Sequence, residues 1–335
     1  MKEVKLYKKL KNSKVQCFTC AHKCIIAPGK RGICDVRENR NGILYSLVYE
    51  KAIALHVDPI EKKPLFHFFP GTKAFSVATV GCNMRCLNCQ NSDISQMPRE
   101  QGKIEGQDVS PEKLVQLAVE YQCRIISYTY TEPTIFWDYA YDTAQLACKK
   151  GIKNTFVTNG YLSEEAIREI APYLDGANVD LKSFSDKTYQ SICGARLQPV
   201  LDSICLMKKL GIWVEVTTLL IPGINDSEEE LTKIASFIHK CDPGIPWHIS
   251  RFYPTYKMLD RPATPLEAIQ KARKIGLGIG LRYVYTGNVP GEEGESTFCY
   301  NCGARLIERW GFSVMGNRIV DGKCPECGVK IDGIW

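Results

Sequence analysis

Cysteine is the residue whose number and spacing most clearly indicate chemistry in this sequence. Of 16 cysteines, 11 fall in three compact groups. A chain of 335 residues can bury its own core, so clustered cysteines in a reducing compartment indicate metal ligands and not disulfides. The groups are Cys17-x2-Cys20-x3-Cys24-x9-Cys34, Cys82-x3-Cys86-x2-Cys89, and the two pairs Cys299-x2-Cys302 and Cys324-x2-Cys327.

The last group has the spacing of a closed metal site. Each pair is followed at once by a glycine, Gly303 or Gly328, which permits the positive φ of a metal-binding turn. Four thiolates in a tetrahedron form a structural zinc site, although rubredoxin-like iron shares the spacing and free thiols are a third reading. A segment of about 35 residues has little core, so zinc binding would supply its stability.

The first group is less regular. Its four cysteines predict a second zinc site; a second iron–sulfur cluster and reduced thiols without metal are the alternatives. His22 could replace one cysteine, but only one residue separates it from Cys20 and only one from Cys24, so the geometry is poor.

The middle group has only three cysteines, with no histidine or fourth cysteine nearby. Three thiolates do not complete a structural zinc site, but they suit a [4Fe–4S] cluster that leaves one iron without a protein ligand. An open coordination position is where a metal centre does chemistry. The loop that carries these cysteines follows a buried strand predicted at 75–80, which Gly81 ends.

Strand and helix patterns alternate from residue 75 to about 288, which predicts an α/β fold with a parallel sheet and right-handed crossovers. Six or seven units indicate a partial (β/α)6-type barrel. N-cap residues of the helices are expected at Ser110, Ser163, Asp226 or Ser227, and Thr264 in a capping box. The predicted strands are 75–80, 124–130, 153–157, 177–181, 212–220, 247–250 and 281–285.

Sites of such sheets lie at the carboxyl ends of the strands. Polar residues at these ends are therefore site candidates, although an ordinary turn or cap role is as common for each, and Asp226 is expected to be an N-cap. Besides the three cysteines, the candidates are Glu132, Thr158, Asn159, Asp180, Lys182, the segment 222–226, His248 and Arg251.

Charge and hydropathy exclude some classes of protein. The net charge is +6, and residues 1–40 alone carry eleven Lys/Arg against three Asp/Glu. This basic segment predicts a solvated tail or a contact surface for an acidic partner such as RNA, although nothing else supports nucleic-acid binding. No apolar run could span a bilayer and no signal peptide is recognisable, so a cytoplasmic protein without membrane contact is expected.

The C-x3-C-x2-C loop after the first strand of a partial barrel resembles the radical S-adenosylmethionine (radical SAM) superfamily. Other segments, over nearly the whole chain, resemble the radical SAM enzyme of the AmmeMemoRadiSam system. The core is also similar to activating enzymes of glycyl radical enzymes such as pyruvate formate-lyase. The segments are 56–71, Cys89 to Gln96, Ile221 to Asp226, the Cys-rich N-terminus and the terminal C-x2-C-G pairs.

The resemblance implies roles for single residues. Cys82, Cys86 and Cys89 would ligate a [4Fe–4S] cluster whose fourth iron chelates S-adenosylmethionine. Many members bind the methionine amino group with Gly-Gly-Glu; here the glycines are missing, and only Glu132 carries over. Thr158 and Asn159 match a segment near the ribose, and Asp180 and Lys182 match an Asp-x-Lys motif near the cofactor. No catalytic residue is assigned.

The implied activity is reductive cleavage of S-adenosylmethionine to a 5′-deoxyadenosyl radical, which abstracts hydrogen from an unidentified substrate. The implied partners are a one-electron donor such as ferredoxin or flavodoxin and Memo-like and AMMECR-type proteins; a glycyl radical enzyme is the alternative. A reading of another class is a non-enzymatic electron-transfer or nucleic-acid-binding metal protein. The expected regions are a basic segment at 1–50, a radical SAM core at 74–288 and a zinc-ribbon-like segment at 295–335.

Five cysteines lie outside the groups. Buried thiols behave as small hydrophobes, so core packing is predicted for each of them. Cys193, in a loop near a strand end, is the one with a redox or radical role as its alternative. The five are Cys123, Cys148, Cys193, Cys205 and Cys241.

Overall fold

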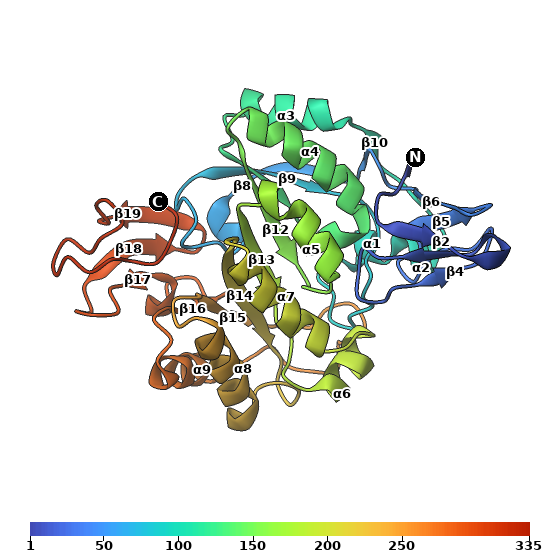
Figure 1. The fold of residues 1–335 in the computed structure, drawn as a ribbon. Helices are drawn as coiled ribbons and strands as arrows, with labels where there is room; N and C mark the ends of the chain where they lie inside the picture. The colour runs from blue at the N-terminus through green and yellow to red at the C-terminus, as the bar shows by residue number, and fades with distance from the viewer.

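A computed structural model of the protein describes residues 1–335 (Figure 1). Its centre is an eight-stranded sheet in the order β16-β15-β14-β13-β12-β11-β9-β8. Neighbouring strands are parallel except β8 (Ala54–Pro59), which pairs antiparallel with β9 at one edge. All seven strands predicted for the barrel are present, and the predicted partial barrel is confirmed. They are β9 (Lys73–Ala78), β11 (Ile125–Tyr128), β12 (Lys153–Thr158), β13 (Gly176–Asp180), β14 (Trp213–Leu220), β15 (Trp247–Arg251) and β16 (Val284–Gly287).

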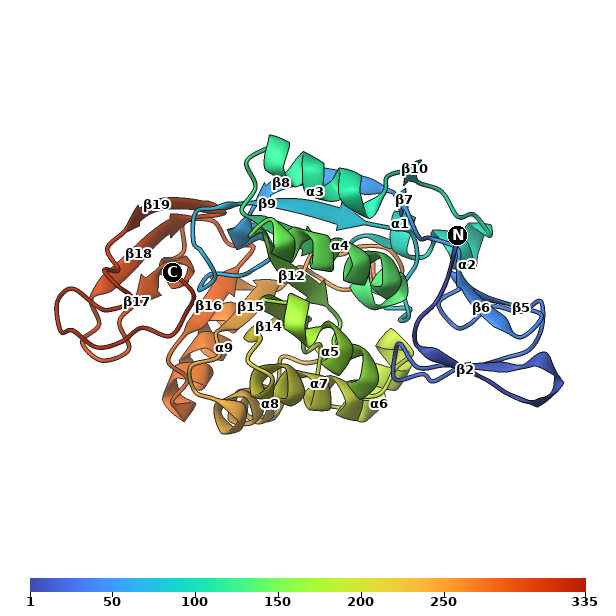
Figure 2. The ribbon, with the colours of Figure 1, turned by 45° about the horizontal axis from the view of Figure 1, so that its top comes forward.

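Six longer helices alternate with the parallel strands and cover the outer face of the curved sheet (Figure 2). The main apolar core lies between sheet and helices and contains Trp137 and Trp247. Short helices follow the first strand and the fourth: α1 (Ser92–Ser95), α2 (Met97–Gln101) and α6 (Asp186–Thr188). The longer helices are α3 (Pro111–Glu120), α4 (Trp137–Lys149), α5 (Glu164–Ile170), α7 (Gln198–Lys209), α8 (Glu228–Cys241) and α9 (Leu266–Ile279).

Serine hydroxyls begin three of these helices as predicted. The side chains of Ser110, Ser163 and Ser227 each accept a hydrogen bond from the N–H three residues later, which satisfies a free donor of the first turn. The capping box at Thr264 is wrong. Its hydroxyl donates to the Leu220 carbonyl, and α9 begins at Leu266 without a side-chain cap.

Two cysteine-rich modules lie at opposite ends of the barrel, the N-terminal one in blue and the C-terminal one in red (Figures 1 and 2). The C-terminal module is one antiparallel sheet of β17 (Thr297–Phe298), β18 (Arg305–Trp310) and β19 (Ser313–Asn317). The N-terminal strands form small sheets β1-β6-β5, β2-β3-β4 and β10-β7. Their bounds are β1 (Lys2–Glu3), β2 (Tyr7–Lys9), β3 (Val15–Cys17), β4 (Ile25–Ile26), β5 (Arg37–Arg40), β6 (Ile43–Ser46), β7 (Lys51–Ala52) and β10 (Gln107–Asp108).

The N-terminal module packs on the carboxyl ends of the strands. Cys20 forms a β-bridge with Leu162, just after β12, and the Ala21 N–H donates to the Tyr161 carbonyl at 3.0 Å. The C-terminal module packs on the amino ends, where Phe68 forms a bridge with Ile334. The two modules therefore contact different ends of the barrel, although Phe312 of the C-terminal module also reaches the cavity described below.

Part of the basic N-terminal segment forms intramolecular ion pairs. Lys2 and Lys5 form ion pairs with Asp142 of α4 and Glu169 of α5, which neither sequence interpretation anticipated. Some of the positive charge therefore helps to attach the N-terminal module to the barrel helices. No helix of the structure combines the length and the apolar composition that crossing a bilayer requires.

Candidate functional site

A cavity of about 500 Å³ lies at the carboxyl ends of the parallel strands, a size that suits a cofactor or a small substrate. Side chains from the ends of successive strands and from the loop after β9 line it together, because parallel strands present their carboxyl ends at one edge. The structure brings all eight predicted cofactor-binding residues to this one cavity: Cys82, Cys86, Cys89, Glu132, Thr158, Asn159, Asp180 and Lys182.

The cysteine loop is held by backbone contacts on both sides. Arg85 and Leu87 donate their N–H groups to the carbonyls of Cys193 and Ile192 at 2.8 and 3.0 Å. Gly81 precedes the loop with φ +107°, and a Cβ there would lie 2.8 Å from Val36 of the N-terminal module. The position of the loop therefore depends on two segments distant in sequence, one at 192–193 and one at Val36.

Hydrogen-bonding groups lie beside the sulfur atoms of Cys82 and Cys89. The Met84 N–H donates to Cys82 Sγ at 3.4 Å, and the Asn159 amide Nδ2 lies 3.8 Å from the same sulfur. The Ser95 hydroxyl lies 3.1 Å from Cys89 Sγ. The Nδ2 of Asn83 is buried without a partner. Such donors stabilise thiolate sulfur, so three thiols on one cavity, with donors beside two of them, fit an iron–sulfur cluster.

The thiols differ in acidity. Burial, followed by the nearby Glu132 carboxylate, raises the pKa of Cys82 well above its usual value. Cys193 faces Cys86, and its hydrogen bond lowers the pKa of Cys86 to about 7. Metal binding requires thiolates, so Cys86 is the thiol closest to the ligating form at neutral pH.

Glu132 is 3% exposed and connects the ends of two strands. Its Oε1 accepts from the Thr134 N–H at 3.0 Å and from the Thr158 hydroxyl at 2.7 Å, and its Oε2 accepts from the Asn159 N–H at 2.7 Å. Burial raises the pKa of this carboxyl, although these hydrogen bonds oppose the shift. Oε1 also accepts from the Thr134 hydroxyl. Each carboxylate oxygen has about two acceptor sites, and Oε2 accepts from Asn159 alone, so Oε2 keeps room for one more donor.

Asp180 and Lys182 form an ion pair at the end of β13, with Nζ 2.8 Å from Oδ2. Burial would lower the pKa of Lys182, but Asp180 and the sulfur atoms of Cys86 and Cys193 outweigh it and hold the pKa well above its usual value. A permanent positive charge therefore stands beside the cysteine loop, where it favours bound anionic groups.

Of the other predicted candidates, Ile224 of the segment 222–226 lines the cavity, whereas His248, Arg251 and Asp226 do not. His248 binds the buried Glu215 carboxylate at 2.6 Å, and Arg251 donates to the Thr264 carbonyl at 2.7 Å. Asp226 is not the N-cap of α8; its carboxylate accepts from the Gly223 N–H at 2.9 Å within the loop before Ser227. These residues have structural partners that account for their polarity.

A cluster that the sequence analysis did not single out lines another part of the cavity. Lys63 is 1% exposed and donates to Asp58 at 2.7 Å, and the Tyr130 hydroxyl donates to the same carboxylate. Burial would raise the pKa of Asp58, but the bonds from Lys63, Tyr130 and Lys62 hold it well below its usual range. Tyr130 also has φ +61°, a rare conformation for this residue. In the sequence, only the acidic and basic residues close together at 58–63 could have indicated this cluster.

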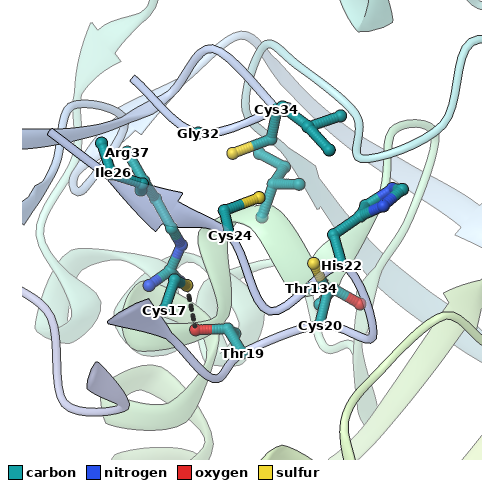
Figure 3. Close-up of a pocket in the computed structure, with 12 residues that line it drawn as sticks. Cys17, Thr19, Cys20, His22, Cys24, Ile26, Gly32, Cys34, Arg37 and Thr134 are labelled. Atoms are coloured by element: carbon teal, nitrogen blue, oxygen red, sulfur yellow. Dashed lines mark hydrogen bonds between the residues drawn. The ribbon is translucent and has the colours of Figure 1, made fainter. Parts of the chain in front are cut away.

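The three cysteine groups have different geometries. The sulfur atoms of Cys299, Cys302, Cys324 and Cys327 all lie within 4.8 Å of one another and could hold a metal ion. The four N-terminal cysteines instead line a separate cavity (Figure 3). Among the remaining cysteines the predicted core packing is wrong for Cys148 and Cys205, which are exposed at helix surfaces; Cys123 and Cys193 are buried and Cys241 is half-buried.

Comparison with known proteins gives consistent results. Residues 76–235 match the model of the Radical SAM superfamily. An uncharacterized protein of Methanocaldococcus jannaschii is 47% identical over 335 residues, 99% of each chain. The pyruvate formate-lyase-activating enzyme of Clostridium pasteurianum is 22% identical over 58% of this chain and 84% of its own.

Solved structures match the fold. Streptococcus suis SuiB superposes with a TM-score of 0.51 at 14% identity, over 68% of this chain and 52% of its own. A radical SAM methyltransferase from Sphaerobacter thermophilus has a TM-score of 0.50 at 15% identity, over 68% of this chain and 71% of its own. At this identity the likeness concerns the barrel and not the substrate.

Proposed function

Because the chain belongs to the radical SAM superfamily, we propose that it is an enzyme that cleaves S-adenosylmethionine at a [4Fe–4S] cluster held by Cys82, Cys86 and Cys89. The observation that carries the proposal is the single cavity that these thiols share with Glu132, Asn159 and Lys182. When bound and reduced, the cluster and S-adenosylmethionine supply a 5′-deoxyadenosyl radical that abstracts hydrogen from a substrate.

The residues of the chain bind and orient in this proposal. Three thiolates hold three irons and leave the fourth position for the cofactor. The remaining acceptor site of Glu132 Oε2 receives a hydrogen bond from the ammonium of S-adenosylmethionine. Thr158 and Asn159 fix that carboxylate from the neighbouring strand. Lys182, charged beside Asp180, sets the electrostatic potential near the cysteine loop.

The substrate and partners are finer proposals. Similarity to pyruvate formate-lyase-activating enzymes supports a protein substrate in which a glycyl radical is made. The segment 56–71, which places Lys62 and Lys63 on the cavity, carries the resemblance to the AmmeMemoRadiSam enzyme and supports Memo-like and AMMECR-type partners. A ferredoxin or flavodoxin would deliver the electron. All 16 cysteines are unpaired, which supports a reducing compartment such as the cytoplasm.

The test is the cleavage reaction. Protein reconstituted anaerobically with iron and sulfide and reduced with dithionite should convert S-adenosylmethionine to 5′-deoxyadenosine and methionine, measured by chromatography. The variant with Cys82→Ala, Cys86→Ala and Cys89→Ala should form none, and a variant of the exposed Cys148→Ala should match the wild type. Equal product from the triple variant would exclude this site.

An electron paramagnetic resonance experiment separates the two kinds of partner. The reconstituted enzyme is mixed with a glycyl radical enzyme from the same genome and then with Memo-like and AMMECR-type proteins. A glycyl radical signal in the first mixture supports the activase version. Faster 5′-deoxyadenosine formation in the second mixture alone supports the other version.

A further inference from the structure

The N-terminal cysteines enclose a cavity of their own beside the active-site loop, which carries Cys82, Cys86 and Cys89. Cys17 ends β3, Cys20, Cys24 and Cys34 lie in the turns and loops that follow, and the four side chains surround one space (Figure 3). The cavity has a volume of about 20 Å³, enough for the centre of a water molecule to move within it. Four thiols therefore face a space that the protein itself does not fill.

The size of this space distinguishes between a single ion and a cluster. Four thiolates about one zinc ion at ~2.3 Å lie roughly 3.8 Å apart and leave no room for water. The C-terminal group has this compact form, with sulfur pairs at 3.6 and 3.7 Å. The N-terminal four do not form a group within 4.8 Å, and neither do Cys82, Cys86 and Cys89. In a cubane cluster each thiolate binds a different iron, so the sulfur atoms lie farther apart.

A buried arginine supplies a second, independent observation. Arg37 lines the cavity and is 2% exposed. Its Nη2 donates to Asp138 at 2.7 Å, while its Nε and Nη1 are buried with no partner. Buried donors are normally satisfied, so the two free N–H groups indicate that a group with acceptor atoms and negative charge belongs beside them. The inorganic sulfides and thiolates of an iron–sulfur cluster are such acceptors.

From the thiol spacing, the cavity and the two free donors of Arg37, we infer that Cys17, Cys20, Cys24 and Cys34 hold a second [4Fe–4S] cluster. The inference goes beyond the proposed function, since all four irons have protein ligands and none is open to S-adenosylmethionine. His22 is not needed as a ligand, because its Nε2 lies 2.8 Å from the Asn83 carbonyl of the active-site loop. The second cluster therefore stands next to the first, in a position to exchange single electrons with it.

The decisive sample is full-length protein with Cys82→Ala, Cys86→Ala and Cys89→Ala, which removes the central site and leaves the N-terminal one intact. After anaerobic reconstitution it should hold about four irons and four sulfides per chain, with about one zinc from the C-terminal group. Dithionite should bleach its visible absorption and produce the resonance signal of a reduced cluster. Adding Cys20→Ser and Cys24→Ser should remove iron and sulfide and leave the zinc.

Three results would overturn the inference: about two zincs with no iron, iron without sulfide, or iron and sulfide that persist when Cys20 and Cys24 are replaced. The matched control adds Cys299→Ala and Cys302→Ala to the same triple variant and should lower zinc without changing iron. Circular dichroism shows whether each variant is folded. None of these measurements requires cleavage of S-adenosylmethionine, so failure here leaves the proposed function standing.

Discussion

The two four-cysteine groups have the same number of thiols but differ in how far apart their sulfur atoms lie. At the C-terminus, two knuckles with Gly303 and Gly328 at φ +76° and +72° bring the sulfur atoms into contact distance. At the N-terminus, the thiols stand around a cavity with a buried arginine. One group closes a small sheet at the amino ends of the barrel strands; the other adjoins the active-site loop. The distances between the sulfur atoms, and not the number of cysteines, therefore indicate what each group binds.

The largest expected effect follows from removing the thiols of the C-terminal group. Cys302→Ala with Cys327→Ala should remove about one zinc, whose binding stabilises such sites by roughly 10–16 kcal/mol. Amide hydrogens of β18 and β19 should lose protection in hydrogen exchange, while the iron content stays constant. Unchanged zinc would mean that this group holds no zinc.

Acid should weaken the C-terminal end through His67. Burial lowers the pKa of this imidazole to about 4, and the ring bonds the Asp332 carbonyl and the Tyr285 hydroxyl, both at 2.6 Å. The imidazole of the unfolded chain binds its proton near pH 6.5. The contribution of His67 to the free energy of unfolding is therefore complete above that pH and falls by about 3 kcal/mol as the pH drops toward 4. Denaturant titrations at each pH measure it. His67→Gln should flatten this slope, and His56→Gln, at an exposed position, should keep it; equal slopes in all three proteins would contradict the assignment.

Replacing Glu132 is expected to change the binding of S-adenosylmethionine and to leave the C-terminal cysteine group unaffected. Glu132→Gln keeps the shape and removes the charge, and it should weaken S-adenosylmethionine binding about 10- to 100-fold, at roughly 1.4 kcal/mol per decade. Anaerobic titration of the reconstituted protein measures the affinity, and zinc content should not change. Unchanged affinity would assign Glu132 to bracing Thr134, Thr158 and Asn159 alone.

The smallest expected effect compares two glycines. Gly81→Ala places a Cβ 2.8 Å from Val36 at φ +107°, so it should destabilise the protein by about 1–2 kcal/mol and lower iron loading beside Cys34. Gly102→Ala is the matched control, since it has φ +68° with nothing within 4 Å. Equal iron loading in both variants would show that contact between the N-terminal module and the active-site loop does not support the clusters.

The barrel was predictable because its strands are largely buried, and several of them, such as β9 and β11, are mostly apolar. The edge strand β8 was missed because His56 and Val57 are exposed and Asp58 is charged, which breaks that pattern. All the predicted cofactor-binding residues reach one cavity because their positions follow from strand ends. The Asp58–Lys63–Tyr130 cluster and the free donors of Arg37 were not predictable, since Tyr130 reaches Asp58 from 72 residues away and Asp138 reaches Arg37 from 101 residues away.

The contact between residues 66–69 and 332–334 also sets an order of events during synthesis. His67 binds the Asp332 carbonyl across 265 positions, and Ile334 exchanges backbone hydrogen bonds with His67 and Phe69 at 2.7 Å. At 5–20 residues per second, a ribosome takes roughly 13–50 s to travel between these partners. For that interval the nascent chain holds the imidazole without its partners, whereas the N-terminal β-hairpins need no residue beyond 46 for their strand pairing. The N-terminal strands around Cys17 can thus pair well before the amino end of the barrel can close.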